Sequence, residues 1–299
     1  MMSSLHTIRK SKGEHIFHGM NTLFMTAMIV ITLYPFIYVV FSSVSDSRLL
    51  LAQTGILWAP LGFTLDAYTM VFKNPNIVSG YLNTLFIVGM GTILNLVMTS
   101  LGAYVLSRKG VAWTRHIMLW IILTMFFSGG LIPMYLLVNN WLHLGNTLFA
   151  LIVPGLISTW NLIILRTSFA AIPESLIESA RIDGAQDLTI LLRVVIPLSL
   201  PVMAVMVLFY GVGHWNSWFG AMIYLRDREL FPLQLILREI LIQNNTNYMA
   251  GNASAEDVEA VGESIKYATI IVATLPILFV YPFLQKYFVK GVMIGSIKE

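Results

Sequence analysis

Six long apolar stretches alternate with shorter polar segments along the 299 residues of the chain. Each is long enough for the roughly 20 apolar residues that an α-helix needs to cross a bilayer. They cover residues 16–44, 81–107, 116–138, 147–167, 196–224 and 265–287. The pattern predicts an all-α membrane protein with six transmembrane helices. Because the first stretch is too long for a signal-peptide core and lacks a small-residue cleavage site, we expect it to stay as the first span.

Helix-breaking residues fall inside several of these stretches. Pro35 is expected to kink the first span. We expect further breaks at Ser128–Gly130 with Pro133 in the third span, Pro154–Gly155 in the fourth, and Gly211 and Gly213 in the fifth. Broken helices are tolerated at membrane depth where protein or a water-filled cavity satisfies the freed backbone. The same small residues also suit close helix packing, so both interpretations stay open.

The composition agrees with a membrane protein and narrows its chemistry. Hydrophobic residues make up 57% of the chain and charged residues only 11%, against about 25% charged in a soluble domain. The chain has no cysteine, which excludes disulfides and cysteine-based metal or redox sites. A net charge of +3 is too small to indicate nucleic acid as a partner.

The distribution of Lys and Arg predicts how the chain is oriented. Twelve of these residues fall on the side of the termini and six on the other side. Since cytoplasmic loops carry the excess of positive charge, both termini are expected in the cytoplasm. Residues 1–16 then form a cytoplasmic segment, residues 17–299 the transmembrane domain, and 45–80 and 225–264 the two sizeable outer loops.

The most polar internal segment, residues 173–197, lies between the fourth and fifth spans on the cytoplasmic side. Pro173 suits the first position of a short helix, and Gly184 suits the left-handed residue that ends it. A second helical run should stop before Pro197, because proline disfavours helix in the residue that precedes it. The segment therefore predicts a helix, a tight turn and a second helix on the membrane face.

Several kinds of chemistry are missing from the sequence. There is no GxxxxGK[ST] phosphate-binding loop, so we expect no ATP or other cofactor on this chain. His15 and His18 lie at the membrane edge, where a solvated interface is expected and not a metal site. No Asp or Glu falls inside the six stretches, which argues against an ion-driven carrier and a di-aspartyl intramembrane protease.

The spans do carry uncharged polar and aromatic residues. Amides and aromatic faces suit sugars, which present both hydroxyl groups and apolar C–H patches. The candidate residues for a substrate pathway are Asn83, Asn95, Trp160, Asn161, Trp215, Asn216 and Trp218. A structural role stays open for each, because Trp is common at membrane interfaces and Asn often joins helices.

The polar segment resembles the EAA loop of ABC-importer permeases. Glu178-Ser179-Ala180, Gly184 and the run Val194–Pro197 follow the spacing of that motif, with Ser179, Val194 and Ile196 as departures from it. Three further features extend the likeness to the carbohydrate group of type I permeases, and within it to the smaller, maltose-type subunit. They are Met125–Pro133, the pair Trp215–Asn216, and the tail Lys290–Lys298. The first of these resembles the branch linked to larger saccharides.

The resemblance implies a role in a larger assembly. It implies a multi-pass permease subunit of the bacterial inner membrane, not itself an enzyme, that moves an oligosaccharide or polysaccharide fragment by alternating access. The implied partners are a second, different permease subunit, two copies of a cytoplasmic ATPase that hold ATP and Mg²⁺, and an extracytoplasmic solute-binding protein. Another polar solute, an exporter, and an ion-independent secondary carrier are the alternatives.

The resemblance also implies which residues touch the partners. The expected ATPase contacts are Glu178, Ser179, Ala180, Arg181, Asp183, Gly184 and Pro197, and we expect Leu176, Ile177 and Ala180 to form an apolar face that the ATPase buries. In the outer loop, Asn244, Asn245, Asn247 and Tyr248 are candidate contacts for the binding protein. A loop that only docks, or one without fixed structure, is the alternative there.

Overall fold

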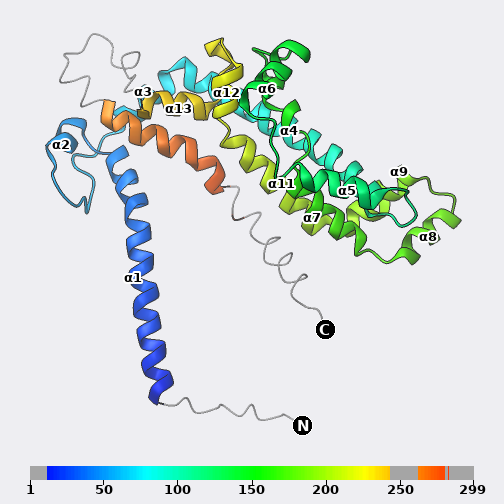
Figure 1. Cartoon of the computed structure of the whole chain (residues 1–299). Coiled ribbons are helices and arrows are strands. Elements are labelled where there is room, and N and C mark those ends of the chain that lie inside the picture. The colour runs from blue at the N-terminus through cyan, green and yellow to red at the C-terminus, as the bar shows by residue number, and fades with distance from the viewer. Residues whose placement is uncertain (1–11, 243–261, 280–281, 283–299) are drawn as a thin grey trace. The chain divides into compact units, whose positions relative to one another are not determined.

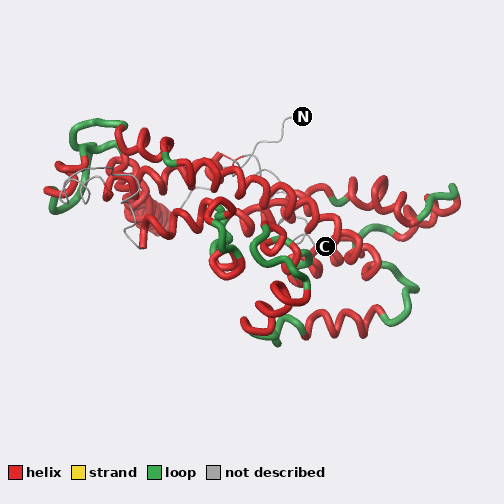
Figure 2. Tube along the Cα trace, turned by 90° about the horizontal axis from the view of Figure 1, so that it is seen from above, coloured by secondary structure: helices red, strands yellow, loops and turns green. Residues whose placement is uncertain are grey.

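The computed structural model describes residues 12–242, 262–279 and 282 of the chain. These residues fall into two units, one made of 12–71 and 262–271 and the other of 72–242, 272–279 and 282. Within the described part, the regular structure is helical and the only β pairing is an isolated bridge between Ser45 and Phe63 (Figure 2). The all-α prediction is therefore confirmed.

The first unit is built on α1 (Lys12–Ser43), followed by α2 (Ser47–Ala52) and most of α3 (Asp66–Lys73). Its contacts gather at the C-terminal end of α1. The Ser43 and Tyr68 hydroxyls lie 2.8 Å apart, and the Tyr38 ring meets the edge of Tyr267 at 5.8 Å. The helix runs unbroken through Pro35.

The second unit is organised around three helices that pack on one another: α4 (Pro75–Ser107), α7 (Thr159–Ala170) and α11 (Leu200–Trp215) (Figure 1). Their buried side chains form one core, which includes Leu165, Phe169 and Met206. The remaining helices are α5 (Thr114–Leu123), α6 (Leu131–Leu136), α8 (Glu174–Ile182), α9 (Asp187–Ile190), α10 (Ile196–Leu198), α12 (Phe219–Tyr224), α13 (Leu233–Ile242) and the helix Gly262–Phe279, which begins in the first unit.

The described part contains three helices long and apolar enough to cross a membrane, or up to five if each bent helix pair is one span. The long ones are α1, α4 and Gly262–Phe279. The predicted fourth span is a bent pair, Leu148–Gly155 with Thr159–Ala170, at 50°. The predicted third span appears as the short helices α5 and α6. The count of six spans thus stays a prediction.

The breaks fall partly where the sequence placed them. Residues 124–130 separate α5 from α6, and Pro154–Gly155 lie in a 3-10 turn before the bend, as expected. The expected break at Gly211 and Gly213 is wrong, because α11 runs through both. The chain bends by 89° at Ser199 instead, between Asp187–Leu198 and Leu200–Trp215.

Candidate functional site

The polar segment after α7 forms the helix–turn–helix that the sequence predicts. α8 (Glu174–Ile182) begins one residue later than expected, because Pro173 is extended (φ −55°, ψ 130°) and precedes the first helical residue. Gly184 has φ +81°, and the N–H of Ala185 donates to the Ala180 carbonyl at 2.9 Å. A left-handed glycine of this kind lets the chain turn without a steric cost.

The second helix of the segment does not stop before Pro197. α9 continues into a π-helical turn, Leu191–Val195, and then into α10, which ends at Leu198. A proline ring inside an α-helix clashes with the carbonyl four residues earlier. The π turn contains Arg193, the residue four positions before Pro197, so the helix is widened where the ring would clash and the expected stop is wrong.

The two faces of α8 differ from the expected arrangement. Ile177 is fully buried in the core of the chain, and the half-buried Ala180 packs against the same cluster. Ile177 therefore packs inside the protein itself, whereas contact of Ala180 with an ATPase stays a prediction. Outward, α8 presents Glu178, Ser179 and Arg181, and Ile182 is 87% exposed. Sequence reasoning missed Ile182, which occupies one of the three positions between Ala180 and Gly184 that the motif leaves unspecified.

An ion pair closes the turn against the end of α4. The Oδ1 atom of Asp187 accepts from Arg181 Nη2 at 3.0 Å and from the Tyr104 hydroxyl at 3.0 Å. The hydrogen bond from Arg181, and then that from Tyr104, lowers the pKa of the Asp187 carboxyl, while Asp187 raises the pKa of Arg181. The helix–turn–helix is thereby tied to α4.

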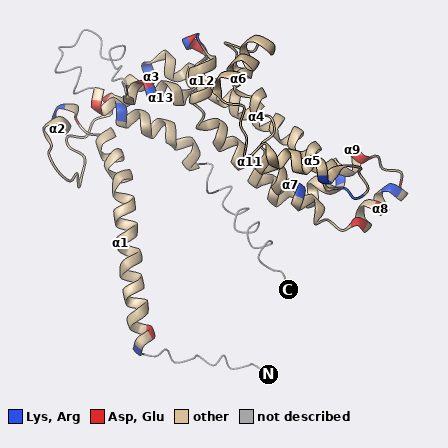
Figure 3. Ribbon diagram, viewed as in Figure 1, with Lys and Arg blue, Asp and Glu red and all other residues tan. Residues whose placement is uncertain are grey.

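Two arginines join the ends of α4 and α7 beneath this segment. Arg108 Nη2 donates to the Phe169 carbonyl at 2.8 Å, and Arg166 Nε donates to the Leu106 carbonyl at 3.2 Å. Each arginine thus satisfies a carbonyl in the last turn of the other helix, where helices have free acceptors and favour cations. The charged residues of the second unit gather at this end and at the opposite one, around an uncharged middle (Figure 3).

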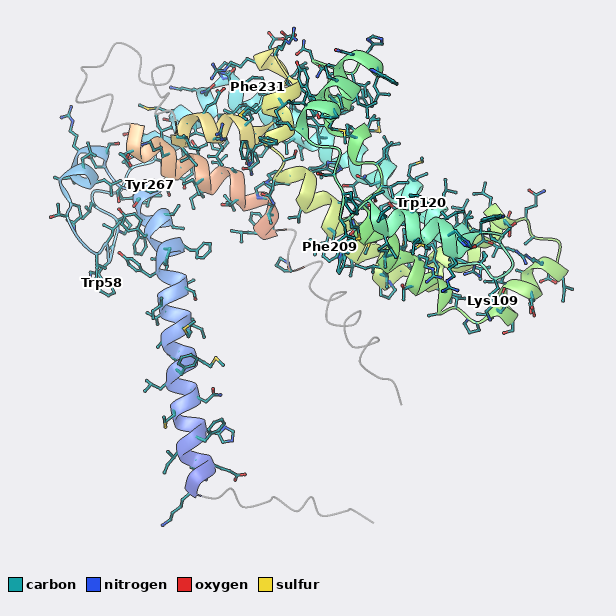
Figure 4. The ribbon with its side chains drawn as sticks, viewed as in Figure 1. Trp58, Lys109, Trp120, Phe209, Phe231 and Tyr267 are labelled. Atoms are coloured by element: carbon teal, nitrogen blue, oxygen red, sulfur yellow. The ribbon has the colours of Figure 1, made fainter. Side chains whose placement is uncertain are left out.

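A large cavity of about 1130 Å³ lies in that uncharged middle, between α4, α7, α11 and residues 276–277. Three candidate pathway residues line it: Trp160, Asn161 and Trp215. Trp160 is 59% exposed, whereas Asn161 and Trp215 are nearly buried. Phe209, labelled in Figure 4, lies on the α11 wall. The lining is mostly apolar and contains no charged side chain among the described residues.

Two other candidates bind backbone carbonyls and do not line the cavity. Asn83 Nδ2 donates to the carbonyls of Glu229, at 2.6 Å, and Phe231. The fully buried Asn95 donates to the carbonyls of Gly155 and Leu156. These amides hold other segments of the second unit in place.

The last candidates lie near the C-terminal end of α11. The indole N–H of Trp215 donates to the Ala273 carbonyl at 3.2 Å. The guanidinium of Arg238 lies 4.4 Å from the centre of the Trp218 ring, and exposed Asn216 donates to the Val212 carbonyl of its own helix. Asn244, Asn245, Asn247, Tyr248 and the tail Lys290–Lys298 lie outside the described residues.

Sequence reasoning did not single out two polar residues that the fold makes important. Thr92 is 8% exposed and lines the cavity, and its hydroxyl has no hydrogen-bond partner within the described part of the chain. Tyr210 accepts the Ser158 N–H at 3.1 Å and shares a hydrogen bond with Thr99. The available signal was a polar group inside an apolar stretch, because such groups need a partner in a membrane.

Comparison with known proteins agrees with this architecture. Protein LplC of Bacillus subtilis (strain 168) is 40% identical over 99% of this chain and 100% of its own length. The polygalacturonan/rhamnogalacturonan transport system permease protein YtcP of the same organism is 40% identical over 92% of this chain and 96% of its own length.

A solved structure extends the agreement to the fold. A chain of a bacterial ABC transporter involved in the import of the acidic polysaccharide alginate superposes with a TM-score of 0.86 at 31% identity, covering 94% of this chain and all of the other. Residues 7–294 match the family described as "Binding-protein-dependent transport system inner membrane component". The chain therefore belongs to this family, the permease subunits of ABC importers.

Proposed function

We propose that this chain is the smaller of two permease subunits that import a saccharide. The proposed substrate is an oligosaccharide or a polysaccharide fragment. A pair of cytoplasmic ATPases would drive the import, and an extracytoplasmic binding protein would deliver the substrate. Two relatives support this substrate class by their names: one is a polygalacturonan/rhamnogalacturonan permease, and the other belongs to an alginate importer.

The single observation that carries the proposal is the segment formed by α8, the Gly184 turn and α9. It lies at one end of the second unit (Figure 1), and its outer surface offers Glu178, Arg181 and Ile182. Its inner surface is fixed to the core by Ile177 and to α4 by Asp187. A small exposed surface on a rigid base suits an ATPase that must move the spans when it closes.

The cavity beside Trp160 supports the saccharide side of the proposal. Trp160 offers an aromatic face, and Asn161, Ser158 and Thr92 bring polar residues to the lining of the same cavity. Aromatic faces and uncharged hydrogen-bonding groups suit a sugar ring. Since none of the described lining residues is a cation, any recognition of an acidic saccharide's charge belongs to the partner permease or the binding protein in this proposal.

The first experiment purifies the chain from its native membrane with its partners and measures ATP hydrolysis. Loaded binding protein should stimulate hydrolysis in the wild type, and Glu178→Ala should lose both the stimulation and the ATPase subunit. Co-purification of no ATPase, with a silent mutation, would remove the proposal. Saccharide uptake that persists without the ATPase would point to a secondary carrier.

A second experiment tests the pathway wall. Trp160→Ala should weaken saccharide binding by roughly 1–2 kcal/mol, about five- to thirtyfold in KM, while the ATPase stays bound. Trp141→Ala is the matched control, because Trp141 is 80% exposed but does not line the cavity. Equal effects of the two substitutions would show that Trp160 has no special role in uptake.

A further inference from the structure

A second cavity, of about 480 Å³, lies at the end of the second unit that carries α8 and α9. Its walls come from the last turns of α4, from residues 108–111 and from α9 and the π turn that follows. Figure 4 labels Lys109 at this end of the second unit. The cavity is separate from the large one beside Trp160, since the two share no lining residue.

The lining is amphipathic. Apolar side chains include Leu101, Val105 and Leu188, and basic side chains are Arg108, Lys109 and Arg181. One carboxylate, Asp187, also lines the cavity. Three positive charges against one negative charge leave the cavity with an excess of positive charge.

The carboxylate and one of the arginines are already paired. Asp187 accepts from both Arg181 and Tyr104, so its charge is balanced within the helix–turn–helix. Arg108 uses Nε and Nη2 to bind Ser107 and the Phe169 carbonyl. Its Nη1 atom and the exposed ammonium of Lys109 donate to no other group in the part of the chain that the structure describes. The excess charge is thus held by Arg108 and Lys109.

This arrangement lies at the boundary between a span and its polar segment. α4 is one of the helices long and apolar enough to cross the membrane, and Arg108 directly follows its last residue. A basic cavity with an apolar wall at such a boundary matches a phospholipid, which carries a phosphodiester beside acyl chains. Basic pockets between membrane helices on the cytoplasmic side bind anionic lipid headgroups.

We propose that this cavity binds the headgroup phosphodiester of an anionic phospholipid, with Lys109 and Arg108 as its cationic ligands and the α4 side chains against the acyl chains. The lipid would contact α4 and α9 together, on either side of the Tyr104–Asp187 hydrogen bond. It would therefore stabilise the position of the helix–turn–helix relative to α4. The effect of this stabilisation on transport rests on the proposed function. The binding of the lipid does not, because it does not require transport.

The test measures lipids that remain bound to the complete complex in mild detergent, by native mass spectrometry. The complex is equilibrated with phosphatidylglycerol and, separately, with phosphatidylcholine. The wild type should retain phosphatidylglycerol preferentially, and Lys109→Gln should reduce this retention by about fivefold, the effect of one cation near an anionic lipid. Lys109→Arg should restore it. Arg115→Gln, which removes an exposed cation outside the cavity, is the matched control.

Other outcomes would overturn the proposal. Equal retention of the two lipids, or equal losses in Lys109→Gln and Arg115→Gln, would show that the cavity does not select an anionic headgroup. Displacement of the lipid by millimolar inorganic phosphate would make it a free-phosphate site. Loss of the ATPase subunit from Lys109→Gln, with lipid retention unchanged, would assign the cavity to a protein partner. None of these readouts uses transport, so failure here is distinct from failure of the saccharide-import proposal.

Discussion

Asn95 Oδ1 and His214 Nε2 lie 2.6 Å apart, and this hydrogen bond joins the middle of α4 to the C-terminal part of α11. The Asn95 amide nitrogen donates to the carbonyls of Gly155 and Leu156 at 2.7 and 2.9 Å. Its oxygen is therefore the acceptor, and His214 carries its proton on Nε2. Asn95 is fully buried, so one amide connects two long helices to the bend before α7.

This connection satisfies a physical requirement of the bend. Where a helix is interrupted at membrane depth, its freed backbone groups need partners from the protein. Asn95 supplies them for two carbonyls, and the Tyr210 hydroxyl accepts the N–H of Ser158. The bend is thus held from α4 and from α11, and we expect it to move with both helices as one body.

Removing the Asn95 amide should destabilise the protein without touching the cavity. Asn95→Ala leaves two carbonyls and His214 without their partner, which costs about 1–3 kcal/mol for a buried polar group. We expect a lower Tm for the purified complex. Asn216→Ala is the control, because exposed Asn216 donates only within its own helix and such a substitution stays within about 0.5 kcal/mol. Equal Tm values for the two variants would contradict the assigned role of Asn95.

The same hydrogen bond depends on the absence of a side chain at Gly91. A Cβ atom added there would lie 2.6 Å from His214 Nε2. Gly91→Ala should therefore displace the imidazole from Asn95 and lower the free energy of unfolding by roughly 1–3 kcal/mol, the usual cost of overpacking. Gly89→Ala, two residues away on α4, meets nothing within 4 Å. It should leave Tm unchanged or raise it, since alanine favours helix over glycine. A Tm of Gly91→Ala that matches that of Gly89→Ala would show that the imidazole moves freely.

The ion pair behind the turn should give the protein a dependence on acid pH. Because the pKa of Asp187 is lowered in the folded protein, its contribution to stability is complete above its ordinary pKa of 3.8. The contribution is lost as pH falls through the lower, folded value. The difference in Tm between the wild type and Asp187→Asn should therefore shrink on acidification below about pH 4.

A second variant checks the cause of this dependence. Arg181 gives the largest contribution to the lowered pKa, so Arg181→Gln should move the loss of stability to higher pH. A Tm difference between wild type and Asp187→Asn that stays constant over the whole acid range would contradict the assignment. So would an acid profile of Arg181→Gln that coincides with that of the wild type.

The sequence predicted local geometry better than it predicted which surface a residue faces. The turn at Gly184 followed from a rule about left-handed residues, and the structure confirms it. Ile177 also lay on a recognisable apolar face of α8, but an apolar face alone does not say whether it meets a partner or the protein's own core. Asn95 posed the same problem within a span, because a polar side chain there serves a cavity or a broken backbone equally well.

Helix breaks were predictable only in part, for a related reason. Pro154–Gly155 lie next to a bend, whereas Gly211 and Gly213 lie inside the continuous helix α11. Glycine weakens an isolated helix, but tertiary packing overrides that preference. The bend at Ser199 follows a π turn and Pro197, where the sequence predicted that a helix would stop and not that it would continue and bend.

The two isoleucines of α8 allow docking to be separated from folding. Ile182 is 87% exposed, and Ile177 is fully buried five residues earlier on the same helix. If Ile182 is an apolar anchor for the ATPase, Ile182→Ser should weaken ATPase binding by about tenfold, as expected for an interface anchor worth 1–2 kcal/mol. It should leave the Tm of the isolated permease pair unchanged, because exposed substitutions cost little.

Ile177→Ala should give the opposite result. It creates a cavity in the core and should destabilise the permease pair by about 2–5 kcal/mol. The protein that remains folded should bind the ATPase with nearly normal affinity. Both quantities are measured on the same preparations, Tm by thermal unfolding and ATPase affinity by titration of the purified subunit. Loss of ATPase binding in Ile177→Ala at a temperature where the permease is folded, with Ile182→Ser normal, would place the ATPase on the side of α8 that the structure assigns to the core.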